Sequence, residues 1–422
     1  TVNIVFNIFE GEKNLVERIN ITGNNITNEE VIRGELILDE GDPFVNLNLE
    51  KSIAELKARR IFKDVKYEVK QGSQKNLKVI NIIVEEQPTG EISAGAGIGT
   101  SGGSFAFNIK ENNWLGEGKS LSFDVQLDKE SLAGQLSFTD PNYDFLGNSL
   151  SYSIASEKND RPNQGYENSI LSASIGTSFE QYKDTNLNLS IAASHDDLKA
   201  ENTASSSLKK QAGDFTELLF TYGIDRDKRD RSFMPTSGNI ISFQQGLPIF
   251  ADQAALFNRI SYSQYHGFTD NVIGAVKFYG ATITALDDDV RLSKRLRMPS
   301  KRLRGFDSKK VGPVDQGDYV GGNYVAALNF EAQLPNLLPE GTNTDVAAFA
   351  DFGNLWSIDY DSSAGSSSKL RSSLGVTTQL YTPIGPVNFV LAQALSKAES
   401  DKTQTFKFFI SIQRFNFCIV SK

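Results

Sequence analysis

From Gly90 to the end of the chain, apolar and polar residues alternate with a period of two, in segments of about ten residues. The clearest segments begin at Leu121, Leu150, Leu187 and Phe406, and polar turns of very different length separate them. Because successive side chains of a strand point to opposite faces, this pattern predicts a long series of antiparallel strands, each with one apolar face.

Two architectures can use strands of this kind. In a soluble sandwich the apolar faces of two sheets pack against each other, whereas in a transmembrane barrel they face lipid and the polar faces line the lumen. The uninterrupted length of ~330 residues and the contrast between short turns and long loops favour the barrel. The low mean hydropathy of −0.31 agrees with it. At ~20 residues for each strand with its connection, the segment predicts a transmembrane β-barrel of about 16 antiparallel strands.

The first part of the chain has a different pattern. Five elements are predicted: a strand at 16–22, helices at about 28–36 and 49–61, and strands at 65–69 and 77–84. Thr27 and Glu30 have the spacing of a capping box at the start of the first helix. The order β-α-α-β-β predicts a small independent α+β domain over residues 14–87, an order that many small domains share.

Composition narrows the possible classes of function. The chain of 422 residues has a formal net charge of −9, which argues against a general nucleic-acid binder with a basic face. Cys418 is the single cysteine, and neither His195 nor His266 has a second ligand at metal-binding spacing. We therefore expect no metal and no cofactor, and nothing in the sequence supports a Ser/His or Cys/His catalytic pair.

The beginning of the chain is abrupt. Residues 1–6 alternate like the last strand of a missing element, so we interpret the chain as a fragment of a longer precursor. No run approaches the ~18 apolar residues of a membrane-spanning helix. No signal-peptide pattern is visible either.

Gly95, Gly97 and Gly99 alternate near the start of the period-two region. A dinucleotide-binding loop would need its third glycine at the position of Thr100, and a helix after it. We interpret the stretch as a glycine-rich first strand, because glycines let a strand bend and pair loosely.

A cationic stretch, residues 301–306, leads into a polar loop. Taken alone, Arg304 is most simply a solvated surface cation. Glu331 and Asp351, however, each interrupt an otherwise apolar strand, and in a barrel such acids are either ordinary lumenal carboxylates or the partners of a buried cation. The sharper hypothesis is that both hold Arg304 through parallel hydrogen bonds, with its loop folded back into the barrel.

These residues resemble the motifs of a known family, the BamA family of outer-membrane-protein assembly factors, within the wider superfamily of POTRA domains and 16-stranded barrels. Residues 303–306, Leu-Arg-Gly-Phe, are similar to its (V/I/L)RG(F/Y) motif on the sixth extracellular loop. Residues 349–353, Phe-Ala-Asp-Phe-Gly, are similar to its F-x-D-x-G strand motif. Further similar stretches follow the family's order, at 113–116, 235–238, 320–323 and 383–386.

The resemblance covers nearly the whole chain and implies its domains. Residues 1–11 would be the end of a preceding POTRA domain, 14–87 the last POTRA domain, 90–417 the outer-membrane β-barrel, and 418–422 a carboxy-terminal tail. Family members usually end on an aromatic residue at the close of the last strand, whereas here five residues follow Phe417. The end of the last strand is therefore not fixed by the motif.

Two functional regions follow from the resemblance. One is a loop clamp, in which the implied residues are Arg304, Gly305, Phe306, Glu331, Asp351 and Gly353. The other is a weak lateral seam between the first strand, about 91–100, and the last, about 405–415. Its implied residues are Gly95, Gly97, Gly99, Phe408, Ile410, Ile412 and Phe415.

The implied function is the insertion of β-barrel proteins into the bacterial outer membrane, with the POTRA domain in the periplasm. Clients would pair with the opened seam, and a thinned bilayer beside it would lower the insertion barrier. The implied partners are unfolded outer-membrane barrel clients, accessory outer-membrane lipoproteins and outer-membrane lipid, with no nucleic acid. No bond is made or broken, so no enzyme is expected.

Two other functions compete with this one. The first is a polypeptide-secretion pore of the same superfamily, which shares the arginine and F-x-D-x-G motifs. The second is an outer-membrane enzyme such as a lipase or protease, which the missing His/Ser constellation disfavours.

Overall fold

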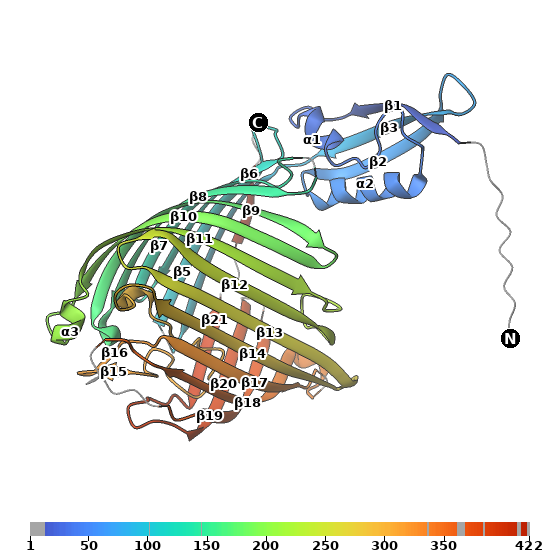
Figure 1. Cartoon of the computed structure of the whole chain (residues 1–422). Helices are drawn as coiled ribbons and strands as arrows, with labels where there is room; N and C mark the ends of the chain where they lie inside the picture. The colour runs from blue at the N-terminus through green and yellow to red at the C-terminus, as the bar shows by residue number, and fades with distance from the viewer. Residues whose placement is uncertain are drawn as a thin grey trace, which may run out of the picture.

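The chain folds into a small domain followed by a large closed barrel (Figure 1). The structure, a computed structural model, describes residues 13–100, 102–144, 146–335, 337–360, 368–382, 385–411 and 415–419. The expected remnant at 1–11 and the seam residue Ile412 lie outside the described residues.

The small domain has the predicted β-α-α-β-β order. Its elements are β1 (Leu15–Thr22), α1 (Glu29–Arg33), α2 (Asn46–Ala58), β2 (Phe62–Gln71) and β3 (Leu77–Glu86). The sheet order is β1-β3-β2, with β1 parallel and β2 antiparallel to β3. Ile32 of α1 and Leu49 and Leu56 of α2 are buried against Ile80 and Ile82 of β3, so helical and strand periodicity meet in one core.

The predicted capping box at α1 is wrong. Asn28, not Thr27, is the residue before the helix, and its side chain makes no capping hydrogen bond. The Thr27 hydroxyl instead accepts a hydrogen bond from Asn113 Nδ2, at 2.9 Å, from the beginning of the barrel. A tertiary contact therefore uses the hydroxyl that local spacing assigned to the helix.

The barrel strands follow one another around the wall in chain order. They are β4 (Gly90–Gly99), β5 (Gly102–Trp114), β6 (Lys119–Asp128), β7 (Ser131–Asp140), β8 (Ser149–Arg161), β9 (Tyr166–Tyr182), β10 (Thr185–Ala200), β11 (Gly213–Asp227), β12 (Ser237–Ala251), β13 (Ala255–Thr269), β14 (Val272–Ala285), β17 (Tyr324–Gln333), β18 (Thr344–Trp356), β19 (Arg371–Thr382), β20 (Gly385–Ser396), β21 (Phe406–Ser411) and β22 (Phe415–Ile419). Both β21 and β22 pair with β4, one after the other along its edge, and this pairing closes the barrel. Because β21 and β22 occupy successive parts of the same edge, they count as one position in the wall, and the seventeen strands named above form the predicted 16-stranded antiparallel barrel.

The exposure of the apolar side chains decides between barrel and sandwich. Phe123, Leu127, Leu136 and Ile154 belong to the alternating apolar series, yet each is 44–57% exposed. On the opposite face, Asn108 Nδ2 donates to Asp124 Oδ1 at 2.7 Å. Apolar residues therefore point outward and polar residues inward, as a lipid-facing barrel requires and a sandwich does not allow.

The remaining short elements lie in the connections between strands. They are η1 (Pro162–Gln164), α3 (Ser206–Lys209), η2 (Leu292–Lys294), β15 (Val314–Asp315), β16 (Asp318–Tyr319) and η3 (Glu340–Thr342). Figure 1 shows α3, β15 and β16 at the end of the barrel away from the small domain. We call that end the far end, and the end that carries the small domain the near end.

Among the described residues, we find no helix with the length and apolar character needed to cross a membrane.

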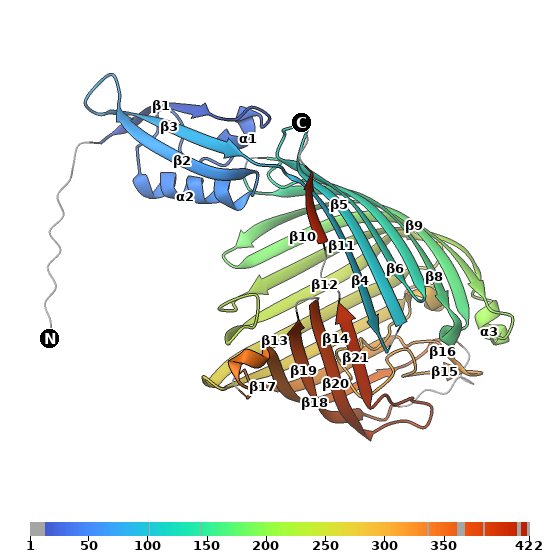
Figure 2. The same ribbon diagram turned by 180° about the vertical axis from the view of Figure 1, so that it is seen from behind.

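The last strand continues beyond the predicted start of the tail. Cys418 and Ile419 belong to β22 and pair with Glu91 and Gly90 of β4. Figure 2 shows β4 and β21 on the side of the barrel where the wall closes. The prediction that a separate tail begins at residue 418 is therefore wrong for these two residues. The strand has partners on β4 up to the first barrel residue, so an aromatic residue does not mark its end.

Candidate functional site

The connection between β14 and β17, residues 286–323, folds back into the lumen, and we call it the inward loop. Its residues Leu303 and Phe306 are 1% and 4% exposed. They share an apolar cluster with Ala281 of β14, Val325 of β17 and Leu355 of β18, whose side chains face the barrel interior. The loop is thus anchored by apolar burial on three adjacent strands.

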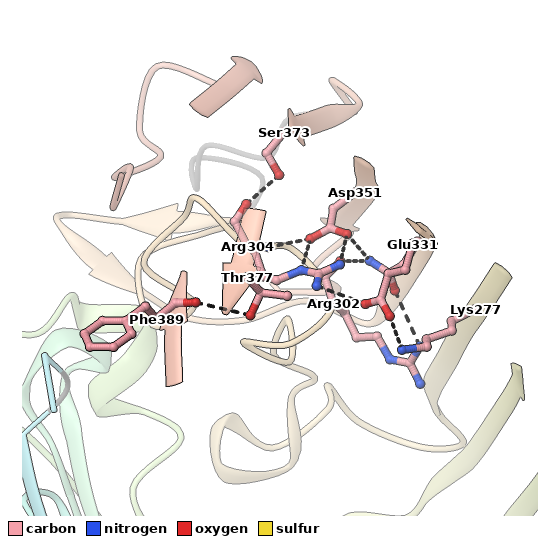
Figure 3. A network of polar contacts seen from close by, with 9 residues as sticks. Lys277, Arg302, Arg304, Glu331, Asp351, Ser373, Thr377 and Phe389 are labelled. Carbon is pink, nitrogen blue, oxygen red and sulfur yellow. Dashed lines mark hydrogen bonds and ion pairs between the residues drawn. The ribbon is translucent and has the colours of Figure 1, made fainter. Parts of the chain in front are cut away.

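Arg304 sits in the centre of this loop and reaches two carboxylates of the wall (Figure 3). Its Nε donates to Asp351 Oδ2 at 2.8 Å and its Nη2 to Asp351 Oδ1 at 2.6 Å, the two parallel bonds of a bidentate pair. The Arg304 backbone N–H also donates to Asp351 Oδ2, at 2.9 Å. Its Nη1 lies 2.9 Å from Glu331 Oε1. The Asp351 side chain is completely buried, so the charge depends on these partners.

A second layer of contacts completes the charge balance. Lys277 of β14 pairs with the other oxygen of Glu331, so the site holds two cations and two anions. Asn329 Nδ2 donates to Asp351 Oδ1 at 2.8 Å. The guanidinium carbon of Arg304 lies 3.6 Å from the centre of the Phe349 ring, a cation–π contact on the same strand as Asp351.

The two glycines of the motifs allow close approach. Gly305 has a φ of +87°, and a Cβ there would lie 3.1 Å from Ala392 Cβ on β20. At Gly353 an added Cβ would lie 3.1 Å from both the Ala326 carbonyl oxygen and Met298 Cε. The structure therefore brings together all six residues of the implied loop clamp. Arg304, Glu331 and Asp351 are joined by ion pairs, and Gly305, Phe306 and Gly353 take part through close packing.

The inward loop also pairs with the loop that leads into β21, residues 397–405, which we call the closing loop. Gln404 N donates to the Gly305 carbonyl at 2.9 Å, Asp307 N to the Lys402 carbonyl at 3.0 Å, and Lys402 N to the Lys310 carbonyl at 3.1 Å. These backbone bonds resemble a short strand pair. They connect the Arg304 site directly to the start of the last strand.

A second buried ion pair holds the closing loop, and sequence reasoning missed it. Arg371, the first residue of β19, donates from Nε to Asp401 Oδ2 at 2.7 Å and from Nη2 to Asp401 Oδ1 at 2.8 Å. Both side chains are fully buried. Asp401 also accepts the backbone N–H of Ala398, at 2.7 Å. No sequence signal distinguishes Asp401 from its exposed neighbour Glu399.

The seam between β4 and the last strand joins the two ends of the barrel wall. Within the described residues, β21 pairs with β4 only over Phe409–Ser411 and β22 over Phe415–Ile419. In contrast, β10 pairs with β9 along its whole length, from Thr185 to Ala200. The described part of the seam is therefore shorter than the β9–β10 pairing, but not shorter than the pairing of β20 with β21 over Val387–Leu391.

Glycines shape the inner side of the seam. Gly97 and Gly99 stand opposite Ser411 and Phe409, and the Phe409 ring covers the space that a side chain at Gly97 would fill. Ile410 pairs with Ile98 of β4, and Phe408 with Phe389 of β20. Phe415 pairs with Ala94. Gly95 pairs with Ala106 of β5, and among the described pairs it has no partner across the seam.

A methyl group at Gly97 is expected to weaken the seam. A Cβ there would lie 2.6 Å from Phe409 Cζ and 2.8 Å from Ser104 Oγ, so the aromatic ring has to move. Gly97→Ala should cost about 1–3 kcal/mol of barrel stability through overpacking. Gly134→Ala is the matched control, because nothing lies within 4 Å of that Cβ position. Unfolding temperatures from heat-dependent gel mobility compare the two, and an equal loss in both would contradict the role of Gly97.

The described part of the chain contains no group of three His, Cys, Asp or Glu side chains that could hold a metal ion. The polar chemistry of the site consists of ion pairs and hydrogen bonds between its own residues. Fold and site together define a membrane-type β-barrel whose lumen holds one of its own loops through a buried arginine.

Comparison with known protein families identifies this architecture. The chain belongs to the Omp85 superfamily, whose domain model matches residues 113–414. A POTRA model, described as a surface antigen variable number repeat, matches residues 15–87. A curated relative, the outer membrane protein assembly factor BamA of Neorickettsia risticii, is 27% identical over 96% of this chain and 56% of its own length. The resemblance predicted from the motifs is thereby confirmed.

Solved structures agree with the fold. A crystal structure of BamA from Haemophilus ducreyi lacking POTRA domains 1–3 superposes with a TM-score of 0.85, at 22% identity over 96% of this chain and 85% of that one. CdiB from Acinetobacter baumannii gives a TM-score of 0.58, at 14% identity over 96% of this chain and 74% of that one. The chain spans a little over half the length of the curated relatives that it matches across nearly its whole length.

Proposed function

We propose that this chain assembles β-barrel proteins in the bacterial outer membrane, with its near end in the periplasm. The relatives named BamA supply the class of activity, and the glycine-lined edge of β4 at the seam is the observation that supports its mechanism here. An incoming client strand pairs with the edge of β4 when β21 and β22 release it, because an unpaired strand edge is a template for another strand.

The Arg304 site keeps the remainder of the barrel in shape while the seam opens. It fixes the inward loop to β18 and β17, four and five positions along the wall from β4, and the closing loop pairs with the inward loop through backbone bonds. The clamp residues thus stabilise the strands that stay paired. Thinning of the bilayer beside the short seam lowers the barrier to insertion.

The POTRA domain offers two strand edges to partners. In the order β1-β3-β2, both β1 and β2 lie at the edge of the sheet. We infer that unfolded clients or accessory outer-membrane lipoproteins bind there by strand addition. Outer-membrane lipid surrounds the apolar outer face of the barrel.

A reversible lock across the seam tests the proposal. Ile98 and Ile410 are opposite each other, so Ile98→Cys with Ile410→Cys, in a Cys418→Ser background, should form a disulfide. Liposomes containing the chain should accelerate the folding of a small unfolded barrel protein when the cysteines are reduced, and not when they are oxidised. The control pair, Leu136→Cys with Ile154→Cys, joins β7 to β8 away from the seam and should remain active in both states.

The alternative function is a polypeptide-secretion pore, and the similarity of the fold to that of CdiB is the reason to test it. The higher TM-score with BamA, 0.85 against 0.58, favours assembly. Acceleration that survives the oxidised seam would contradict strand pairing at β4. An absence of acceleration in the reduced protein, together with substantial ion conductance, would favour the pore.

A further inference from the structure

A rigid loop of the POTRA domain, residues 23–28, carries an exposed apolar residue at its tip. The backbone N–H groups of Asn25, Ile26 and Thr27 all donate to the Glu86 carboxylate, at 2.7–3.2 Å. Burial raises the pKa of Glu86, but the hydrogen bonds from Thr27 and its neighbours lower it by more, so the carboxylate stays charged. Ile26 is nevertheless 64% exposed. We call this segment the tip loop.

The tip loop is fastened to the near-end rim of the barrel, residues 113–119. Asn113 Nδ2 donates to the Thr27 hydroxyl at 2.9 Å, and Asn28 N donates to the Gly116 carbonyl at 2.8 Å. Gly116 has a φ of +75°, and a Cβ there would lie 2.2 Å from the Ile26 carbonyl oxygen. The POTRA domain therefore meets the rim at a backbone contact that only glycine allows, and Ile26 is held at a fixed place beside the barrel.

The rim beside Ile26 is also apolar and exposed. Trp114 is 39% and Leu115 74% exposed. With Ile26 and Pro88 they line a groove of about 440 Å³ between the POTRA domain and the barrel. Three large apolar side chains from two domains thus stand together in solvent, and this costs free energy unless something covers them.

The register places this patch on the lipid side of the wall. Trp114 pairs with Lys119, and along β6 the residues on the same face as Lys119 are Leu121 and Phe123, which point outward. Lys119 pairs with Glu117 at 2.7 Å and with Asp140 at 3.8 Å. An aromatic residue level with charged side chains is typical of the boundary between hydrocarbon and headgroups.

We propose that Ile26, Trp114 and Leu115 form a membrane-contact patch that inserts into the periplasmic leaflet and rests the POTRA domain on phospholipid beside the seam. The patch is continuous with the lipid-facing surface of β5 and β6, so one bilayer covers both. Because the tip loop is rigid, the contact fixes the height of the POTRA domain above the membrane. The linker to β4, residues 87–89, lines the same groove, so the contact lies next to the start of the seam strand.

Site-specific fluorescence in lipid tests the patch. Ile26→Cys in a Cys418→Ser background carries an environment-sensitive dye, and the full chain is reconstituted in phosphatidylcholine liposomes without any client. We expect a blue-shifted emission, and loss of intensity when the lipid carries a nitroxide near its headgroup. The readout contains no assembly step, so its result does not depend on the proposed function.

The matched control is Val69→Cys, since Val69 is also an exposed apolar POTRA residue, 37% exposed, near the end of β2. Figure 1 shows the hairpin between β2 and β3 at the end of the POTRA domain away from the barrel. The dye there should keep a water-like emission and escape the quencher. Asn25→Cys on the same tip loop provides a second position if the Ile26 variant does not give a heat-resistant barrel. A water-like, unquenched dye on the tip loop would overturn the proposal.

Discussion

Arg304→Ala is expected to lower the free energy of barrel unfolding by about 3–5 kcal/mol, because it leaves a buried charge without its partner. Asp351 is completely buried and would keep two neutral donors, the Asn329 amide and the backbone N–H of residue 304, but no cation, whereas Glu331 would still have Lys277. Urea unfolding in lipid or detergent, followed by the mobility of the folded band, measures the loss.

Two further variants separate the ion pair from general damage to the loop. Arg302→Ala removes a neighbouring cation that stacks on Tyr279 and makes only a long 3.4 Å hydrogen bond to Asn329. It should cost less than about 1 kcal/mol. Arg304→Leu combined with Asp351→Asn should recover part of the loss, since no uncompensated charge remains. Equal losses for Arg302→Ala and Arg304→Ala would contradict the clamp.

Asp401→Ala is the second substitution with a large expected effect, again about 3–5 kcal/mol. It leaves the Arg371 guanidinium, which is fully buried, with the side-chain oxygen of Asn354 as its remaining side-chain acceptor. The closing loop also loses the acceptor of the Ala398 N–H. Because β21 follows directly, amide hydrogen exchange should increase in β21 more than in β10.

Glu399→Ala is the matched control for this prediction. Glu399 lies in the same closing loop and is exposed, so its removal should change stability by less than about 0.5 kcal/mol. If Asp401→Ala proved as mild as Glu399→Ala, the buried pair would not determine where the last strand begins. A uniform rise in exchange over β10 and β21 would argue for global loosening instead of an effect on the seam.

The sequence predicts those parts of the molecule that depend on a local repeat of apolar and polar residues. Alternation places Phe123 and Leu127 on one face whatever the strand pairs with, and this is enough for the barrel. The same logic predicts the ion pairs of Arg304, because Glu331 and Asp351 are acids within apolar strands. The family motifs then bring the loop into the lumen.

Contacts that depend on register could not be predicted. Asn329 reaches Asp351 because β17 and β18 pair these two residues directly, and no pattern within either strand specifies that pairing. Arg371 and Asp401 come together from a strand start and a loop, thirty residues apart in the chain. The Thr27 hydroxyl was assigned to a capping box because the rim residue that uses it is 86 residues away.

The apolar cluster of the inward loop has a consequence for permeability. Leu303, Phe306 and Val311 are each at most 4% exposed and pack on the inner faces of β14, β17 and β18. Because these side chains are sealed against the wall, the inward loop takes up that part of the lumen, which a general diffusion porin would leave to water. The cross-section left for water and ions is therefore smaller than the number of strands alone would set.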